Sequence, residues 1–345
     1  MLVWLGWALA ALLTVIVMIA VRNQFDEPLD AKTQAWLKLQ LQTVPPEQNG
    51  FYYLYGFSAA KGNPAIAGKA WLDQLQTARN EIKYKPLINC PEKDGPCLTH
   101  VLEHSVAYRQ RLAENEILLD RYRTLLAYSQ FDEVLGSIDT NAPNSSVGYT
   151  ANLYRAQIAL DYAAGNTVAN QHLLSNLRFW IMALKGSRAT LMAMVATAQV
   201  KRTLRLIDDL QLENPDTLRP IRKELRTLMA ELLRIDTRAL IAQTQRSEFY
   251  KMGPGWEKES VHLGVFSLFY QANATRNTLR PYFEFPRAVS VKPCKPVDVV
   301  FNPINPVGRI LICEVTRYDI QKCLVKIENI QRTAGRLNNA LQEQH

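Results

Sequence analysis

An uninterrupted apolar run at the amino terminus constrains this chain more than any other feature. Residues Leu2 to Val21 read LVWLGWALAALLTVIVMIAV and contain no charged side chain. Twenty residues of α-helix are about 30 Å long, which matches the hydrocarbon core of a bilayer. Trp4 and Trp7 lie near the start of the run, where an interfacial aromatic belt is expected. The run predicts a transmembrane anchor over residues 1–22, in contact with lipid through residues 2–21, and a polar body after it.

A secretory signal peptide and a buried core helix are the alternatives to an anchor. A signal peptide has a basic segment, a shorter apolar core and small residues before its cleavage site. No Lys or Arg precedes this run, and Met18-Ile19-Ala20 is a poor cleavage site. The length of the run and these residues favour an uncleaved, single-pass anchor.

Two observations disagree about the side of the membrane on which the body lies. Arg22, Lys32 and Lys38 follow the run, and the positive-inside rule, read literally, places them in the cytoplasm. Cys90 and Cys97 instead bracket the turn-rich segment PEKDGP, which favours a disulfide and therefore an oxidising compartment. We favour the second indication and expect the body to lie outside the cytoplasm, in the bacterial periplasm or an equivalent compartment.

Composition divides the rest of the chain into three segments. Residues 23–97 predict a membrane-proximal segment with short helices and the cysteine-bracketed loop, because Gly, Pro and Asn are frequent there. Residues 98–280 have apolar side chains at helical spacing and predict a helical domain. Residues 281–345 are rich in proline and predict an extended segment that ends in an amphipathic helix.

The expected fold class is mainly α. The segments 149–164 and 168–185, separated by Gly165, have the length and the turn of a helical hairpin. We expect a stack of antiparallel helical hairpins after the transmembrane helix, followed by a small mixed β/α segment. Its two short strands are expected at 297–301 and 309–315, where branched apolar residues are dense.

One short motif suggests catalysis. His100, Glu103 and His104 form the pattern H-x-x-E-H, in which two histidines hold zinc and the glutamate activates water. Such a site needs a third ligand, and no acidic residue has a context that marks it as one. The other interpretation, which we favour, is a solvated helix face. Cys294, Cys313 and Cys323 permit one further disulfide, but no C-x-x-C pair predicts a zinc site.

The chain is basic, with a formal charge of +8, and cations gather between Arg178 and Arg238. Acidic residues at helical spacing predict that much of this face is salt-bridged, and an anionic-partner surface is the alternative. The residues expected on that surface are Arg188, Lys201, Arg202, Arg205, Arg222 and Lys223; Arg219 and Arg226 belong to the same stretch. Nucleic acid is not expected as the partner, because aromatic residues do not interleave with the charges.

Several segments together carry a resemblance. Tyr154 to Arg202 contains AQIALDYAAGNTVAN, LRFWIMALKGS and TLMAMVATAQVKR, and the motif Asn305-Pro306-Val-Gly308-Arg309 follows later. In these residues, roughly a third of the chain, the sequence resembles a family of uncharacterised proteobacterial single-pass membrane-anchored proteins. The resemblance implies a Gram-negative inner-membrane setting and implies no activity or site residue.

The expected function follows from these indications. Nucleotide-binding loops, serine-hydrolase elbows and calcium-binding loops are absent from the sequence. We expect a non-catalytic, membrane-anchored periplasmic binding, scaffold or assembly protein of the bacterial envelope, with a protein partner and no cofactor. The alternative is a membrane-tethered zinc hydrolase that uses His100, Glu103 and His104.

Overall fold

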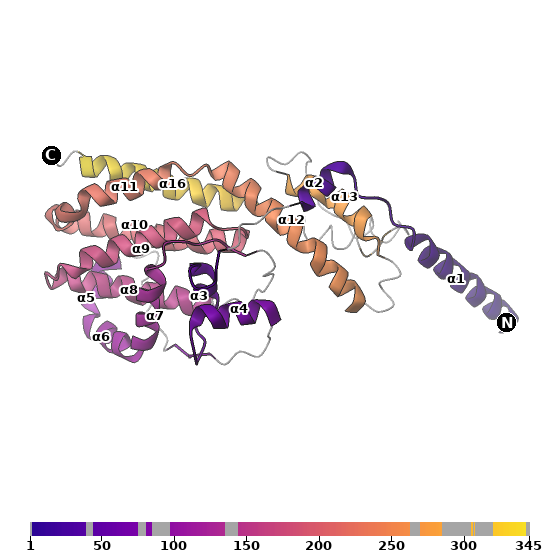
Figure 1. The fold of residues 1–345 in the computed structure, drawn as a ribbon, viewed down its shortest axis with the longest axis horizontal. Helices are drawn as coiled ribbons and strands as arrows, with labels where there is room; N and C mark the ends of the chain where they lie inside the picture. The colour runs from indigo at the N-terminus through magenta and orange to yellow at the C-terminus, as the bar shows by residue number, and fades with distance from the viewer. Residues whose placement is uncertain are drawn as a thin grey trace. The chain divides into compact units, whose positions relative to one another are not determined.

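The chain is described by a computed structural model in which residues 2–38, 44–74, 81–84, 97–134, 144–262, 270–284, 305, 307 and 320–342 are placed. These residues are mainly helical (Figure 1). Within them, the one β contact is an isolated bridge between Ala59 and Glu81. The strands predicted at 297–301 and 309–315 lie outside the described residues.

The chain forms two compact units: residues 1–41 with 241–320, and residues 42–240 with 321–345. The first unit contains α1 (Leu2–Asn23), α2 (Ala31–Leu37), most of α12 (Thr237–His262) and α13 (Ala272–Phe283). A segment of α1, Gly6–Asn23, is long and apolar enough to cross a membrane, and 6% of it is buried. The predicted N-terminal apolar helix is therefore confirmed, and its length and composition suit a membrane anchor or a signal sequence.

The carboxyl-terminal end of α1 is bonded into the first unit through two asparagines. Asn23 is 2% exposed, and its side-chain amide donates to the Ile19 carbonyl at 2.7 Å. The Asn305 backbone N–H donates to Asn23 Oδ1 at 2.7 Å, and the Asn305 side chain donates to Thr275 Oγ1 at 2.8 Å. Asn305 has a φ of 52°, a left-handed conformation that asparagine adopts more readily than most residues. These bonds join α1 to α13.

Asp26 and Gln271 add a second set of bonds between the same two helices. The Asp26 carboxylate accepts from the backbone N–H groups of Asn273 at 2.6 Å and Ala274 at 3.0 Å. These N–H groups lie in the first turn of α13, where they have no partner within the helix. The Gln271 side chain donates to the Phe25 carbonyl at 3.0 Å. The residues that directly follow α1 therefore cap α13.

A small aromatic cluster completes the first unit. Phe249 of α12, Leu279 and Phe283 of α13 are buried, and Trp36 of α2 packs against them. The ring centroids of Trp36 and Phe249 are 5.7 Å apart, with the rings nearly perpendicular. Burial of such side chains is the main source of packing energy available to so small a unit.

The second unit holds the remaining helices. They are α3 (Gly50–Tyr55), α4 (Pro64–Gln74), α5 (Cys97–Glu103), α6 (Ser105–Glu114), α7 (Glu116–Leu126), α8 (Asn144–Ala163), α9 (Val168–Lys185), α10 (Thr190–Glu213), the 3₁₀-helix η1 (Pro215–Ile221), α11 (Arg222–Leu233) and α16 (Ile320–Gln342). α8 contacts α5, α6, α7, α9 and α10, and α9 contacts α10 and α11. α8 and α9 therefore form the centre of this unit.

A chain of hydrogen bonds joins four buried side chains of α7, α9 and α10. Trp180 Nε1 donates to the Tyr122 hydroxyl at 2.7 Å, and this hydroxyl donates to Asn176 Oδ1 at 2.7 Å. The Asn176 side chain then donates to Thr203 Oγ1 at 2.8 Å. All four side chains are fully buried. Burial raises the pKa of Tyr122, so its hydroxyl stays protonated and keeps donating.

The helices are shorter than their apolar spacing predicts in one region. Residues 98–128 have apolar side chains at helical spacing throughout, but the structure divides them into α5, α6 and α7, with breaks at His104 and Asn115. α8 and α9 meet at the predicted turn, where Gly165 has a φ of 71°. The wider stack of antiparallel hairpins stays a prediction.

Candidate functional site: a basic groove along α11

A groove with a volume of about 1080 Å³ lies on the second unit. Its lining residues come from η1, α11, the residue after α11 and α16: Arg219, Arg222, Lys223, Arg226, Thr227, Ala230, Arg234, Asn338 and Gln342. Five of these nine residues are cations and none is acidic. Cations gathered without acids create a positive potential, which attracts anions. We call this feature the basic groove.

The amphipathic sequence of α11 explains one wall of the basic groove. Its buried side chains recur at spacings of three and four residues and form one apolar face: Leu225, Leu228, Met229 and Leu232. Arg222, Arg226 and Ala230 are also four residues apart, so they form a second stripe along the same helix. Packing of the apolar face therefore directs the cationic stripe away from the core.

α16 is held beside α11 and α10 by polar contacts at two points (Figure 1). The Gln331 side chain donates to the carbonyls of Leu232 at 3.1 Å and Ile235 at 2.8 Å. Arg336 forms an ion pair with Asp208 of α10 at 2.7 Å. These contacts fix the position of α16 along the end of α11.

The second wall of the groove is formed by amides of α16. Leu337 and Leu341 are buried in the unit, with exposed fractions of 1% and 0%. Asn338 and Gln342 each follow one of these leucines and line the groove. Being four residues apart, they lie on one face of the helix. The groove thus has a cationic wall and a wall of neutral amides.

Two carboxylates near α11 form ion pairs, one with a groove residue and one with a residue outside the groove lining. Arg219 pairs with Asp216 at 2.7 Å, but both side chains are about 70% exposed, and such pairs are weak. Glu231, which is on α11 but does not line the groove, pairs with Lys185 at 2.8 Å. Arg226 Nε is buried and has no hydrogen-bond partner in the described part of the chain. The groove can therefore offer hydrogen-bond donors and positive charge to an anion.

The structure divides the six cations predicted to form an anionic-partner surface. Arg222 and Lys223 line the groove. The other four lie elsewhere: Arg188, Lys201, Arg202 and Arg205. Sequence reasoning missed Arg234 and the two α16 amides. The helical spacing of Arg222, Arg226 and Arg234 was a usable signal, whereas only the tertiary fold brings Asn338 and Gln342 to α11.

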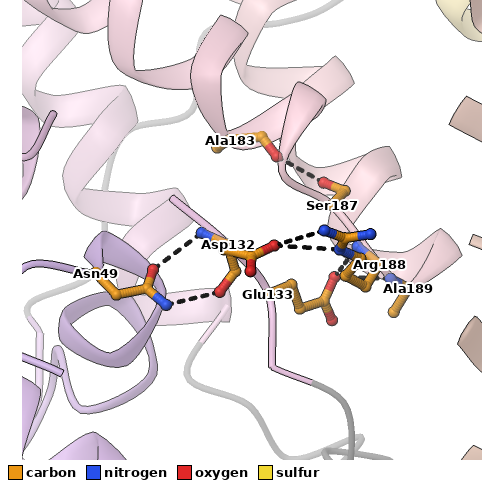
Figure 2. Close-up of polar contacts among 7 residues, drawn as sticks. All are labelled: Asn49, Asp132, Glu133, Ala183, Ser187, Arg188 and Ala189. Atoms are coloured by element: carbon orange, nitrogen blue, oxygen red, sulfur yellow. Dashed lines mark hydrogen bonds and ion pairs between the residues drawn. The ribbon is translucent and has the colours of Figure 1, made fainter. Parts of the chain in front are cut away.

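Arg188 is part of a charged cluster that serves the fold, shown in Figure 2. Its Nε and Nη2 atoms donate to Asp132 Oδ1 at 3.1 and 2.9 Å. The Asp132 backbone N–H and carbonyl are both bonded to the Asn49 side chain, at 3.0 and 2.7 Å. We call Asp132, Glu133 and Arg188 the paired cluster. Its arginine joins distant segments of the chain.

Glu133 connects the paired cluster to the start of α10. It is 4% exposed, and its carboxylate accepts from the backbone N–H groups of Arg188 at 2.6 Å and Ala189 at 2.7 Å. The same segment approaches Gly186 so closely that a Cβ added there would lie 1.9 Å from the Phe131 carbonyl oxygen. Only glycine fits at that contact.

The α10 cations lie beside buried polar groups. Arg155 is 6% exposed and donates to Gln199 Oε1 at 2.9 Å. The pKa of Arg155 is lowered to about 10, chiefly by burial and in smaller part by the charge of Arg202. Arg205 has a different neighbour, the Asp209 carboxylate, and its charge tends to lower the pKa of that acid. Arg202 and Arg205 thus act on groups within the unit.

Asp209 connects α10 to Cys97 of the predicted disulfide. Its Oδ2 accepts from the backbone N–H groups of Cys97 at 2.9 Å and Leu98 at 3.3 Å, at the start of α5. Burial raises the pKa of Asp209, although these two N–H groups and the charge of Arg205 oppose the shift. Cys90 lies outside the described residues, so the Cys90–Cys97 bond stays a prediction.

The predicted metal-site residues meet at the break between α5 and α6. The ring centroids of His100 and His104 are 4.4 Å apart, and His104 Nδ1 donates to the His100 carbonyl at 3.0 Å. Glu103, the last residue of α5, is exposed. Among the described residues, no group of three His, Cys, Asp or Glu side chains is placed to hold a metal ion. The structure therefore supplies no observation that favours the zinc-hydrolase alternative.

Comparison with models of known protein families, with curated proteins and with solved structures finds no match to this chain. The basic groove and the end of α1 are therefore the features of the chain that bear on its function.

Proposed function

We propose that this chain is a membrane-anchored binding protein whose helical body holds an anionic partner in the basic groove. The observation that carries the proposal is the lining of the groove, five cations and no acid. The protein has many acidic residues, yet none of them lines this groove. A surface with only positive charge fits a binding site for a partner that supplies the negative charge. The role is that of an adaptor or assembly factor, and it needs no cofactor.

The end of α1 supports an uncleaved anchor over a cleaved signal peptide. Asn23 is buried, and Asp26 caps α13 within three residues of it. A signal peptide is removed from the folded protein, so its final residues have no reason to be built into a helix cap. α1 exposes large apolar side chains along its length, as a helix surrounded by lipid does.

We place the anchor in the inner membrane of a Gram-negative bacterium and the body in the periplasm. The cysteine-bracketed loop supports this placement, because a Cys90–Cys97 disulfide would persist in that compartment. Alkaline phosphatase fused after His345 should be active, and a cytoplasm-dependent reporter at the same place should be silent. The reverse pattern would put the body in the cytoplasm and remove the reason for the disulfide.

The binding role is tested in the intact, membrane-anchored protein. A photoreactive amino acid at position 230, inside the groove, should crosslink to a partner in cells, and one at position 201 should not. The crosslink should disappear in the variant Lys223→Glu/Arg226→Glu, which reverses two groove charges.

The matched control is Lys201→Glu/Arg332→Glu. Both side chains are exposed and lie outside the groove lining, so this variant changes the net charge equally. It should keep the crosslink at position 230. If position 230 forms no crosslink, or if both variants behave alike, the groove is not the binding site.

A further inference from the structure

The cations of the basic groove lie in a row, which restricts the shape of the anion. Arg222, Arg226 and Arg234 are spaced by multiples of four residues along α11 and its end. Arg222 and Arg234 are twelve residues apart, so the row is about 18 Å long at the rise of an α-helix. A compact anion such as a single phosphate reaches one or two of these cations. A linear polyanion reaches all of them.

The other lining residues indicate which class of linear polyanion the groove can bind. None of them is aromatic, although single-stranded nucleic acids are bound largely by stacking of bases on aromatic side chains. Only Ala230 is apolar, so the groove offers no cover for a lipid acyl chain. The absence of aromatic side chains and of an apolar surface among the lining residues disfavours nucleic acid and lipid. The remaining candidate is a polymer that binds through its charges and polar groups.

The amide wall favours a polypeptide over a polyphosphate. Each primary amide, in Asn338 and in Gln342, offers two N–H donors and a carbonyl acceptor. A peptide backbone presents donors and acceptors alternately and can satisfy both. A polyphosphate presents only acceptors, so the two amide oxygens would face negative charge. Arginine, which supplies four of the five cations, forms paired hydrogen bonds with carboxylates.

The amide wall also indicates an extended chain. The backbone N–H and C=O groups of an α-helix are bonded within the helix, whereas those of an extended chain are free to bond with Asn338 and Gln342. Alternate side chains of an extended chain lie on one face about 6.6 Å apart. This distance is close to the rise of about 6 Å between Arg222 and Arg226.

We infer that the basic groove binds an acidic polypeptide segment in an extended conformation, with carboxylates at alternate positions facing α11 and its backbone against Asn338 and Gln342. This inference rests on the proposed function and specifies its partner. It assigns the charges of α11 to affinity and the amides of α16 to recognition of the peptide backbone.

The experiment uses the full chain in nanodiscs of neutral phosphatidylcholine and measures fluorescence anisotropy of labelled probes. The probes are an alternating Glu-Thr peptide, a helix-forming peptide of Glu and Ala, polyphosphate, and single-stranded oligodeoxythymidine, all with equal numbers of charges. The Glu-Thr peptide should bind most tightly, and added salt should weaken its binding. Lys223→Glu/Arg226→Glu should weaken it at least about tenfold, since charge-assisted hydrogen bonds are lost. Lys201→Glu/Arg332→Glu should change it less than about twofold.

A second variant separates recognition of the backbone from attraction of charge. Asn338→Leu/Gln342→Leu removes both amides and keeps every cation. It should therefore weaken binding of the Glu-Thr peptide and leave binding of polyphosphate unchanged. Tighter binding of polyphosphate, oligodeoxythymidine or the helical peptide, lost in Lys223→Glu/Arg226→Glu, would overturn the inference and leave the anion-binding function standing. Equal weakening of the Glu-Thr peptide and polyphosphate by the amide variant would also overturn it. If no probe responds to the groove charges, the inference and the proposed function both fail.

Discussion

The paired cluster and the basic groove contain the same residue types and use them in opposite ways. In the paired cluster, Arg188 meets Asp132, and Glu133 accepts from two backbone N–H groups. In the groove, five cations line an open volume with no acid among them. The first arrangement balances charge inside the fold, and the second is the one that we propose binds an anionic partner.

This contrast shows that the position of an arginine in the sequence does not reveal its role. Arg188 and Arg222 belong to one cationic stretch and were predicted to form one surface. Arg188 precedes α10 and faces a loop that Asn49 holds in place. Arg222 begins α11, whose apolar face turns the cations outward. Stability measurements can test whether the two groups differ as the structure indicates.

The largest effect is expected at Glu133. Glu133→Ala leaves the partly buried N–H groups of Arg188 and Ala189 without their shared acceptor, which should cost about 3 kcal/mol of unfolding free energy. Glu133→Gln keeps one acceptor oxygen and should lose less than half of that. Urea unfolding followed by far-UV circular dichroism measures both. If the alanine variant loses less than about 0.5 kcal/mol of unfolding free energy, Glu133 does not stabilise the fold as argued.

A smaller loss is expected for Arg188→Ala. The Arg188 and Asp132 side chains are 24% and 20% exposed, so the pair is partly screened by solvent. Its removal leaves the Asp132 carboxylate partly buried and should cost about 1–2 kcal/mol. Arg188→Lys, which keeps the charge but loses the two-nitrogen contact, should fall between the wild type and the alanine variant in the same unfolding experiment. A lysine variant less stable than the alanine variant would contradict this account.

Sequence patterns predicted the helical class of the fold and several helices closely. α9 (Val168–Lys185) has the predicted bounds, and α10 ends at Glu213, directly before the helix-stopping pair Asn214-Pro215. These segments have strong apolar periodicity and clear stop signals. The break between α11 and α12 has no glycine or proline to mark it. There, Asp236 accepts from the N–H groups of Arg238 and Ala239, a helix-start signal hidden inside a continuous apolar pattern.

The candidate site was predicted only in part, for a physical reason. The cationic stripe of α11 is local and follows from helical spacing. The partners that neutralise other cations come from distant segments; Asp132, for example, is 56 residues from Arg188. The α16 wall is more than one hundred residues from α11. A single sequence carries no signal for such contacts, so it cannot separate a paired arginine from one that lines a groove.

The effect of burial on Asp209 can be tested by measuring stability as a function of pH. Burial raises its pKa above the usual value, so the folded protein holds this proton more tightly than the unfolded chain does. The stabilising contribution is full below the unfolded pKa, near 3.8, and is lost as pH rises through the folded pKa. Asp209→Asn should remove this decrease while keeping an acceptor for Cys97 and Leu98. Wild type and variant should therefore differ in the slope of unfolding free energy against pH as the pH rises above the unfolded pKa. Parallel pH profiles would contradict the burial argument.

The smallest effect, with the opposite sign to that at Arg188, is expected in the basic groove. Lys223 and Arg226 are three residues apart on α11, and Arg222 is four residues before Arg226, so like charges face each other along the helix. Lys223→Ala/Arg226→Ala removes this repulsion and should raise the unfolding free energy by about 0.2–0.5 kcal/mol. Added salt should stabilise the wild type more than the variant, because it screens the same repulsion. A loss of more than about 1 kcal/mol would mean that these cations support the fold as Arg188 does. A small gain in stability combined with loss of peptide binding would assign the groove to a partner, because charges that serve the fold are not expected to destabilise it.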